Sequence, residues 1–193
     1  MFGLKKKWPQ IKKNRSLVTL RPLKQSDASN VCRWMASWYI VQNSFVIKSH
    51  KAIPHDFATI EYAARYFDML LTDKKRKTFA IMYSGAHIGT IGLKNINPLE
   101  CSCECFIEIG EPNLRGQGLG PMAMSLLLDV AFNNVGLTEV MLDVLEFNAP
   151  AIKAYHRLGF TTKTPICWHY DEYGQHWRVL KMGLNRERYN MLA

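Results

Sequence analysis

The sequence predicts one mixed α/β domain, built as a three-layer sandwich with helices on both faces of a central sheet. Two observations support this fold class. In the middle of the chain, apolar strand segments alternate with single helical segments, whereas hairpins are expected toward both ends. The length of 193 residues, with 48% hydrophobic and 21% charged residues, is typical of a single globular domain.

The first half of the chain predicts two helices and a β-hairpin. Its expected elements are a strand at Leu17–Arg21, a helix from Ser26 to Tyr39, a helix at 56–72, and strands at Thr78–Tyr83 and His87–Asn97. Ser26 and Asp27 are good N-caps because their side-chain oxygens satisfy the first helical amides. Ser84-Gly85 between the two strands is typical of a hairpin turn.

The second half predicts two strand–helix units and a terminal hairpin. Its expected elements are a strand at Glu104–Gly110, a helix from Gly118 to Gly136, a strand at Glu139–Leu145, a helix at Ala149–Leu158, and strands at Phe160–Tyr170 and Gln175–Leu184. Gly136 suits the position after a helix C-terminus. Asn148 suits an N-cap, with Pro150 in the first turn that follows.

The positive charge of the chain is concentrated at its N-terminus. Of the net charge of +9, six positive charges lie in the first 15 residues, which contain no acid, so the rest of the chain carries only +3. We therefore expect a basic arm at 1–16 and one domain at 17–193. A solvated, frayed arm is the simpler interpretation, and an arm that touches RNA or the ribosome is the alternative.

The cysteines do not predict a metal site or a disulfide framework. Their number is odd, no CxxC pair occurs, and no histidine is close in sequence to Cys101, Cys103 and Cys105, which alternate along one predicted strand. The five are Cys32, Cys101, Cys103, Cys105 and Cys167. We expect reduced thiols, no bound metal, and a cytoplasmic protein without a secretory signal or a membrane span.

The most informative segment is Arg115-Gly116-Gln117-Gly118-Leu119-Gly120, between a predicted strand and a predicted helix. Three glycines within five residues remove Cβ atoms where a backbone turns tightly. Their amides lie at a helix N-terminus, a geometry that binds pyrophosphate. The hexapeptide alone also fits an ordinary strand–helix turn, and it matches neither a Walker A loop nor a Rossmann fingerprint. Asn148, Tyr155 and Gly159-Phe160 follow it at set distances and favour the cofactor interpretation.

The pattern Arg115-x-x-Gly118-x-Gly120, followed by N-x-P-A-I-x-x-Y-x-x-L-G-F, resembles the acetyl-CoA-binding core of the GNAT N-acetyltransferases. The resemblance is strong over about residues 104–160. VTLRPLKQSDASNVCRWM and ECFIEIGEPNLRGQGLG are similar to the RimJ/RimL-like and spermidine-acetyltransferase-like branch. The fold that this resemblance implies is the GNAT sandwich, whose mixed sheet is splayed at its centre around the acetyl-CoA site.

The resemblance implies acetyl-CoA as co-substrate, held largely by backbone groups. The amides from Arg115 to Gly120 would hold the pyrophosphate, and the backbone at the end of the preceding strand would pair with the pantetheine arm. Capping alone explains Asn148, and the matching asparagine of the family also contacts the cofactor arm. The expected cofactor-binding residues are Ile109, Gly110, Glu111, Arg115, Gly116, Gln117, Gly118, Leu119, Gly120, Asn148 and Ala151.

The acid of acetyl transfer is predicted more sharply than the base. Tyr155 occupies the place of the family's general-acid tyrosine, and a phenol can protonate a departing thiolate. For the base, the sequence offers Glu104, Glu108 and Glu111 on or near the central strand and Asp143 on the next. The spermidine-type branch favours Glu104, and the ribosomal-protein branch favours Asp143. Ordered water alone serves many members of the superfamily.

We therefore predict an acetyl-CoA-dependent N-acetyltransferase that acts on a primary amine by direct attack in a ternary complex. The amine belongs to a peptide or ribosomal-protein N-terminus, a polyamine, an amino sugar or an aminoglycoside. The alternatives are a non-catalytic acetyl-CoA-binding regulatory module and an RNA-associated or ribosome-associated protein that uses the basic arm. We expect a monomer or homodimer, no membrane contact, and no nucleic-acid contact apart from the arm.

Overall fold

A computed structural model describes residues 17–35, 37, 60–163, 167–170 and 176–192. Within these ranges, eight strands form one mixed sheet. The strands are β1 (Val18–Pro22), β2 (Lys77–Tyr83), β3 (Ala86–Asn97), β4 (Ser102–Ile109), β5 (Glu139–Leu145), β6 (Thr161–Thr162), β7 (Cys167–Tyr170) and β8 (His176–Asn185). Their order is β1-β2-β3-β4-β5-β8-β6, with β7 paired to β8. The pairing of β4 with β5 is parallel, and the other neighbours are antiparallel.

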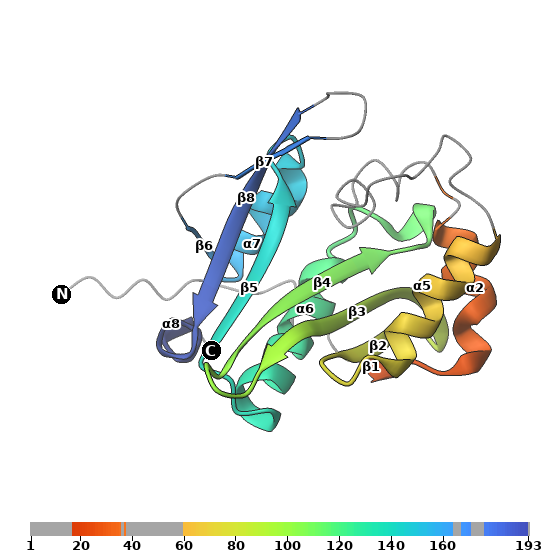
Figure 1. The fold of residues 1–193 in the computed structure, drawn as a ribbon, viewed down its shortest axis with the longest axis horizontal. Coiled ribbons are helices and arrows are strands. Elements are labelled where there is room, and N and C mark those ends of the chain that lie inside the picture. Colours follow the sequence, from red (N-terminus) through yellow and green to blue (C-terminus); the bar gives the residue numbers. More distant parts are fainter. Residues whose placement is uncertain (1–16, 36, 38–59, 164–166, 171–175, 193) are drawn as a thin grey trace.

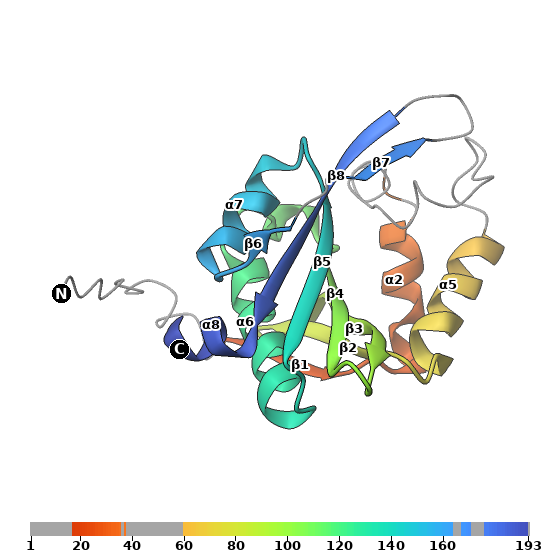
Figure 2. The same ribbon diagram turned by 60° about the vertical axis from the view of Figure 1, so that its left-hand side comes forward.

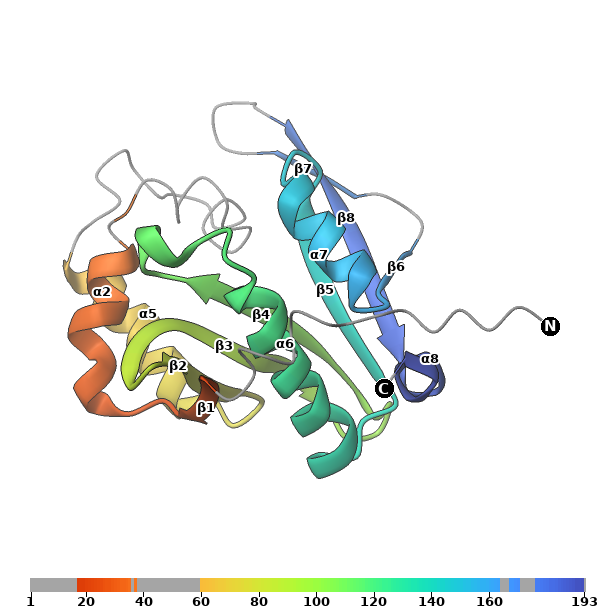
Figure 3. The same cartoon turned by 180° about the vertical axis from the view of Figure 1, so that it is seen from behind.

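Helices cover both faces of this sheet, as the three-layer prediction requires. They are α2 (Ala28–Met35), α5 (Ile60–Thr72), α6 (Leu119–Asp129), α7 (Ala149–Arg157) and α8 (Arg186–Leu192). Figure 1 shows α2 and α5 side by side on one face, and the reverse view in Figure 3 shows α6 and α7 on the other. No helix in the described ranges is long and apolar enough to cross a bilayer.

Two apolar cores fill the spaces between the layers. The larger core lies beneath α6 and is closed by fully buried side chains such as Ile91, Leu127 and Phe132. The smaller core joins α2 and α5 to the sheet around Trp34 and Phe67. Helical spacing produces these faces, because residues three or four positions apart lie on the same side of a helix.

The sheet splits at its centre, between β4 and β5. The two strands pair only from Ser102 to Glu104 and from Glu139 to Met141, near their N-terminal ends. Beyond these residues they diverge, and the resulting V is clear in Figures 1 and 2. Both strands therefore leave backbone groups without a strand partner toward the splay, where a ligand can replace the missing strand.

Within the described residues the predicted elements are confirmed, with local exceptions. Ser26 and Asp27 are not N-caps, because they lie in a 3₁₀ turn at Gln25–Asp27 whose N-cap is Lys24, and the α-helix begins after it at Ala28. The expected end of that helix at Tyr39, and residues 56–59 of the next predicted helix, lie outside the described residues. The helix after the glycine loop is α-helical only to Asp129 and continues as a π-turn over Val130–Asn134, where Arg186 donates hydrogen bonds to the carbonyls of Phe132 and Leu137. The single strand expected at Phe160–Tyr170 is wrong, since β6 and β7 are separate strands. The helix α8 was not predicted, and it begins after Asn185, whose Oδ1 accepts the N–H of Arg188 at 2.9 Å. The basic arm at 1–16 lies outside the described residues.

Candidate active site

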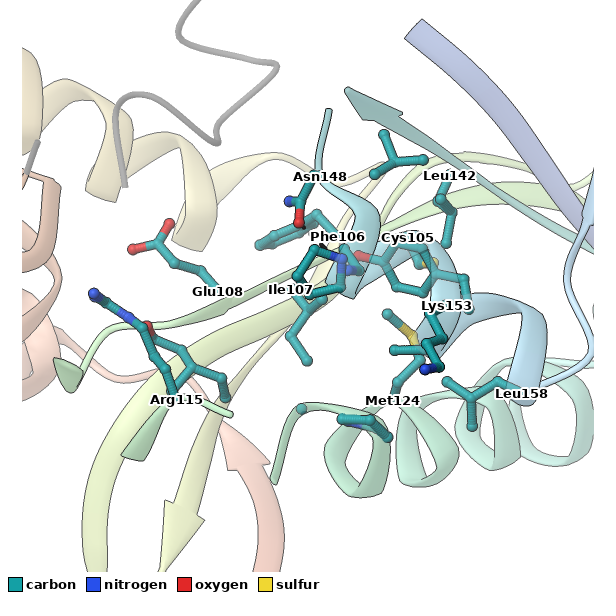
Figure 4. Close-up of a pocket in the computed structure, with 18 of the residues that line it drawn as sticks. Cys105, Phe106, Ile107, Glu108, Arg115, Met124, Leu142, Asn148, Lys153 and Leu158 are labelled. Atoms are coloured by element: carbon teal, nitrogen blue, oxygen red, sulfur yellow. Dashed lines mark hydrogen bonds between the residues drawn. The ribbon is translucent and has the colours of Figure 1, made fainter. Parts of the chain in front are cut away.

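A cavity of about 540 Å³ opens in the splay between β4 and β5. Its walls come from β4, the glycine loop, the start of α6, the end of β5 and the inner side of α7. In Figure 4, Glu108 and Arg115 lie at one end of this cavity, and Met124, Lys153 and Leu158 lie at the other. The cavity spans the sheet, because side chains from both faces of β4 line it.

The glycine loop presents unpaired amides to this cavity. Gly116 and Gly118 have φ angles of 74° and 80°, in the left-handed region that favours glycine. Gly118 is the N-cap of α6, and the first intrahelical bond there runs from the N–H of Met122 to the Gly118 carbonyl at 3.3 Å. A Cβ at Gly116 or Gly118 would meet open space, so close packing does not explain these glycines. Their left-handed φ angles explain them, and the turn that they form leaves free amides at a helix N-terminus, where an anion can bind.

The remaining side chains of the loop fold back onto the protein. Arg115 donates from Nε to the Ile109 carbonyl at 2.9 Å and from Nη2 to the Gly110 carbonyl at 2.7 Å. Gln117 donates to the Asn113 carbonyl at 2.6 Å. The side chain of Leu119 is buried in the larger core. Any contact that Gln117 or Leu119 makes with a ligand in the cavity would therefore come from its backbone.

The end of β4 shows which of its predicted backbone contacts face the splay. The N–H groups of Gly110 and Glu111 both donate to the Ile88 carbonyl, at 2.9 and 3.2 Å. Ile109, the residue before Gly110, lies opposite Gly89 of β3. Alternate residues of an antiparallel ladder direct their backbone groups to opposite sides of the strand. The backbone of Ile109 thus faces the splay, whereas the amides of Gly110 and Glu111 are used within the sheet.

Helix α2 is tied to this same strand end. The Glu111 carboxylate accepts hydrogen bonds from Arg33 at 2.5 Å and from the Trp34 indole at 3.1 Å. The Trp34 ring also lies against Gly110, where a Cβ would approach Trp34 Cδ2 to 1.9 Å. Gly110 is therefore required for packing, and the side chain of Glu111 is a tie between helix and strand.

Helix α7 forms the opposite wall. The Oδ1 atom of Asn148 accepts the N–H of Ala151 at 3.3 Å, which confirms the predicted N-cap, and both residues line the cavity. Tyr155 lies one turn further along the inner side of α7, with its ring centroid 5.9 Å from that of Phe160. Burial, with a smaller contribution from Cys105, raises the pKa of the Tyr155 phenol well above its usual value. The phenol is therefore protonated at neutral pH.

The carboxylates on β4 differ in their surroundings. Burial raises the pKa of Glu104, but Lys94, whose Nζ lies 3.1 Å from Glu104 Oε2, outweighs this effect and holds it below the ordinary range. Burial raises the pKa of Glu108 to about 7, because the positive charge of Arg115 offsets only part of the desolvation. Glu108 lines the cavity and Glu104 does not.

Asp143, the other predicted base, also lines the cavity. It lies on β5 opposite Lys181 of β8, on the strand across the splay from β4. The structure thus brings Tyr155, Glu108 and Asp143 to one cavity and leaves Glu104 outside it.

The residues that line the cavity on the α2/α5 side were not predicted from the sequence. They are Tyr66 on α5, Arg76 before β2, Lys94 on β3 and Phe106 on β4. Strand alternation could have placed Phe106 on the face of Glu108. Nothing in the local sequence indicates that Arg76 and Lys94 reach the same cavity, since they belong to separate elements.

Comparisons with known proteins agree with this geometry. The model of the acetyltransferase (GNAT) domain family matches residues 18–161. The spermidine N(1)-acetyltransferase of Escherichia coli K12 is 27% identical over 172 residues, which cover 89% of this chain and 88% of that protein. Acetyltransferase PseH of Campylobacter jejuni is 28% identical over 105 residues, or 54% of this chain and 64% of that protein.

Among solved structures, the spermidine N-acetyltransferase of Vibrio cholerae in complex with CoA and spermine shares the fold. Its TM-score is 0.76 at 20% identity, and the match covers 91% of this chain and 99% of that one.

Proposed function

The chain belongs to the GNAT acetyltransferase family and is an acetyl-CoA-dependent N-acetyltransferase, and we propose that its acceptor is a primary amine that attacks directly in a ternary complex. The observation that carries this proposal is the single cavity, which reaches through the splayed sheet. The glycine loop and α7 line one side of this cavity, and the side chains of Glu108 and Phe106 line the other. Donor and acceptor can therefore meet between β4 and β5 without a covalent acetyl-enzyme.

The residues of the cofactor side fit the parts of acetyl-CoA. The free amides from Gly116 to Gly120 suit the pyrophosphate, because they lie at the positive end of the α6 dipole. The Ile109 carbonyl accepts from Arg115, so the Ile109 N–H is the group that suits a carbonyl of the pantetheine arm as an added strand. Asn148 and Ala151 line the cavity at the start of α7, where they would contact the other side of the pantetheine arm. Acetyl-CoA supplies the activated thioester at the centre of the splay.

Glu108 is the base in this proposal, in preference to Glu104 and Asp143. An amine must lose a proton before or during attack, and a base with a pKa near the working pH performs this transfer best. Glu108 has a pKa of about 7 and lines the cavity. The ion pair of Glu104 with Lys94 stabilises its charged form and makes it a weaker base.

Tyr155 is the acid. Its phenol carries a proton at neutral pH because burial raises its pKa. It lines the cavity from α7, across the splay from β4. The proton of Tyr155 can pass to the CoA thiolate as the thioester bond breaks, while Glu108 holds the proton of the amine. The two residues together balance the protons of the reaction.

The identity of the amine is open among a polyamine, a peptide or ribosomal-protein N-terminus, an amino sugar and an aminoglycoside. The Escherichia coli and Vibrio cholerae relatives are named for spermidine, which supports including polyamines among the acceptors to be tested. The match to PseH covers 105 residues, fewer than the 172 matched in the Escherichia coli enzyme.

The test is release of free thiol from acetyl-CoA with each class of acceptor. We expect acceptor-dependent release that falls by about 100-fold in kcat for Tyr155→Phe, the scale of general acid catalysis, with acetyl-CoA affinity unchanged. Tyr189→Phe is the matched control, since Tyr189 stacks on Phe132 near α8 and does not line the cavity. Binding of acetyl-CoA without turnover of any acceptor would favour the regulatory module, and no binding would contradict the proposal altogether.

A further inference from the structure

Two largely buried cations line the acceptor side of the cavity. The Arg76 side chain is 13% exposed and lies with its Cζ atom 5.9 Å from the centre of the Phe106 ring. The Lys94 side chain is 15% exposed, on the strand next to β4. Both residues line the cavity together with Phe106 and Glu108. A guanidinium and an ammonium in one partly desolvated cavity attract anions more strongly than the same groups in water.

Each cation forms an ion pair with a carboxylate that does not line the cavity. Asp73 Oδ2 lies 3.0 Å from Arg76 Nε, and Glu104 Oε2 lies 3.1 Å from Lys94 Nζ. A guanidinium has five N–H donors and an ammonium has three, so one contact uses only part of each group. These two ion pairs fix the cations in place and leave N–H donors for a ligand, as a preorganised anion site requires.

We propose that Arg76 and Lys94 form an anion-binding subsite, so that the acceptor is an amine that also carries a phosphate or carboxylate group. This inference rests on the proposed function, because it concerns the second substrate of the same site.

The spacing along β4 gives a rough scale for the length of such an acceptor. Phe106, beneath Arg76, is two residues from Glu108, and Glu104, beside Lys94, is four residues from it. At the rise of an extended strand, the Cα atoms of Phe106 and Glu104 lie roughly 7 and 13 Å from that of Glu108. A hexosamine phosphate or an N-terminal dipeptide with an acidic side chain spans distances of this order, whereas a polyamine would place a second ammonium beside two cations. Like charges in one site disfavour binding, and we therefore expect the N–H donors of Arg76 and Lys94 to favour an anionic group over the second ammonium of a polyamine.

The first experiment compares matched acceptors at saturating acetyl-CoA. One pair is glucosamine 6-phosphate and glucosamine, the other is Ala-Glu-amide and Ala-Gln-amide, and spermidine is the cationic comparison. We expect kcat/KM to be higher by about tenfold for the anionic member of at least one pair, on the scale of a charge-assisted hydrogen bond. The pair that shows the preference identifies phosphate or carboxylate as the group. Equal turnover within both pairs, or better turnover of spermidine, would overturn the proposal.

Variants assign the preference to the two cations. Arg76→Gln and Lys94→Gln are expected to remove most of it, because each should lower kcat/KM for the anionic acceptor more than for its neutral partner. Arg76→Lys keeps the charge but loses the planar fork, so it is expected to retain part of the preference. Lys163→Gln is the matched control, because Lys163 pairs with Glu139 at 2.8 Å and does not line the cavity. A preference that survives both glutamine variants would contradict the assignment.

A second measurement does not depend on turnover. The enzyme is saturated with CoA, which fills the glycine loop, and its Tm is followed as inorganic phosphate is added. We expect a saturable rise in Tm, with phosphate affinity about tenfold weaker in Arg76→Lys on the same bidentate scale. No rise in the wild type would overturn the subsite even if no acceptor is found, whereas a rise without any thiol release would count against the proposed function alone.

Discussion

The two sides of the cavity are built in different ways. The cofactor side comes mainly from two nearby segments, the loop and helix at 115–129 and the helix after Asn148, and its expected contacts are backbone amides. The acceptor side comes from α5, the loop before β2, and strands β3, β4 and β5, and its groups are the side chains of Tyr66, Arg76, Lys94, Glu108 and Asp143.

This difference explains why the donor is easier to identify than the acceptor. Backbone contacts require a fixed turn geometry, and that geometry leaves glycines and caps at fixed spacing in the sequence. Side-chain contacts require only that a suitable group reach the cavity, and many positions satisfy that condition. Substitutions on the two sides should therefore affect different kinetic constants.

The largest effect in this comparison is expected on the acceptor side, from Glu108→Gln. Loss of the base should lower kcat by about 100-fold, the scale of general base catalysis. In the wild type, kcat should rise with pH through about 7, because Glu108 must lose its proton to act and burial holds its pKa there. This limb should disappear in the variant. The pH profile of kcat, measured with saturating substrates, tests both statements.

Two controls accompany this substitution. Glu104→Gln should leave the limb near pH 7 in place, since the pKa of Glu104 lies below the ordinary range. The Tm of Glu108→Gln at pH 8 should equal or exceed that of the wild type. When folding raises the pKa of a carboxyl, the folded protein loses stability as the pH rises from the unfolded pKa to the folded pKa of that group. Glutamine does not titrate, so the variant does not lose this stability. An unchanged pH limb in Glu108→Gln would exclude Glu108 as the base.

A smaller effect is expected on the cofactor side, from Gly118→Ala. A φ of 80° costs a residue with a Cβ about 1 kcal/mol or more, so alanine at position 118 should relax to another conformation in the free protein. Acetyl-CoA would then have to return the loop to its original conformation, and its affinity should fall by about tenfold. Gly136→Ala is a close control, because Gly136 has a φ of 86° with equally open space and lies beyond the far end of α6. Isothermal titration with acetyl-CoA distinguishes them. Equal affinity in the two variants would show that the loop does not bind the cofactor.

The smallest effect should come from Asn148, which the structure uses as a cap. Asn148→Ala should lower stability by about 1 kcal/mol through loss of the bond to the Ala151 amide. Asn148→Asp keeps an N-cap oxygen and should recover that stability. If Asn148 also donates its amide to the cofactor arm, the aspartate variant will be stable and will still bind acetyl-CoA more weakly. If Asn148→Asp recovers both the stability and the acetyl-CoA affinity of the wild type, Asn148 acts only as an N-cap.

Much of the fold could be predicted because its signals are short. The turn at Ser84-Gly85, the N-cap at Asn148 and the glycines before α6 each act within a few residues, so their patterns survive in the sequence. The π-turn at Val130–Asn134 could not be predicted in this way. The Phe132 carbonyl in this turn accepts a hydrogen bond from Arg186, 54 residues further along the chain.

By itself the sequence predicted the order of most strands and helices, the position of the glycine loop, and Tyr155 as the candidate acid. Only the tertiary structure distinguishes the surroundings of Glu104 and Glu108, which occupy equivalent positions on the same face of β4. The pKa of a carboxyl depends on the charges and the water around it, and these come from other elements of the sheet. Lys94 of β3 stabilises the charge on Glu104, while burial in the cavity removes water from Glu108. Folding brings these neighbours together, and local sequence does not encode their distance.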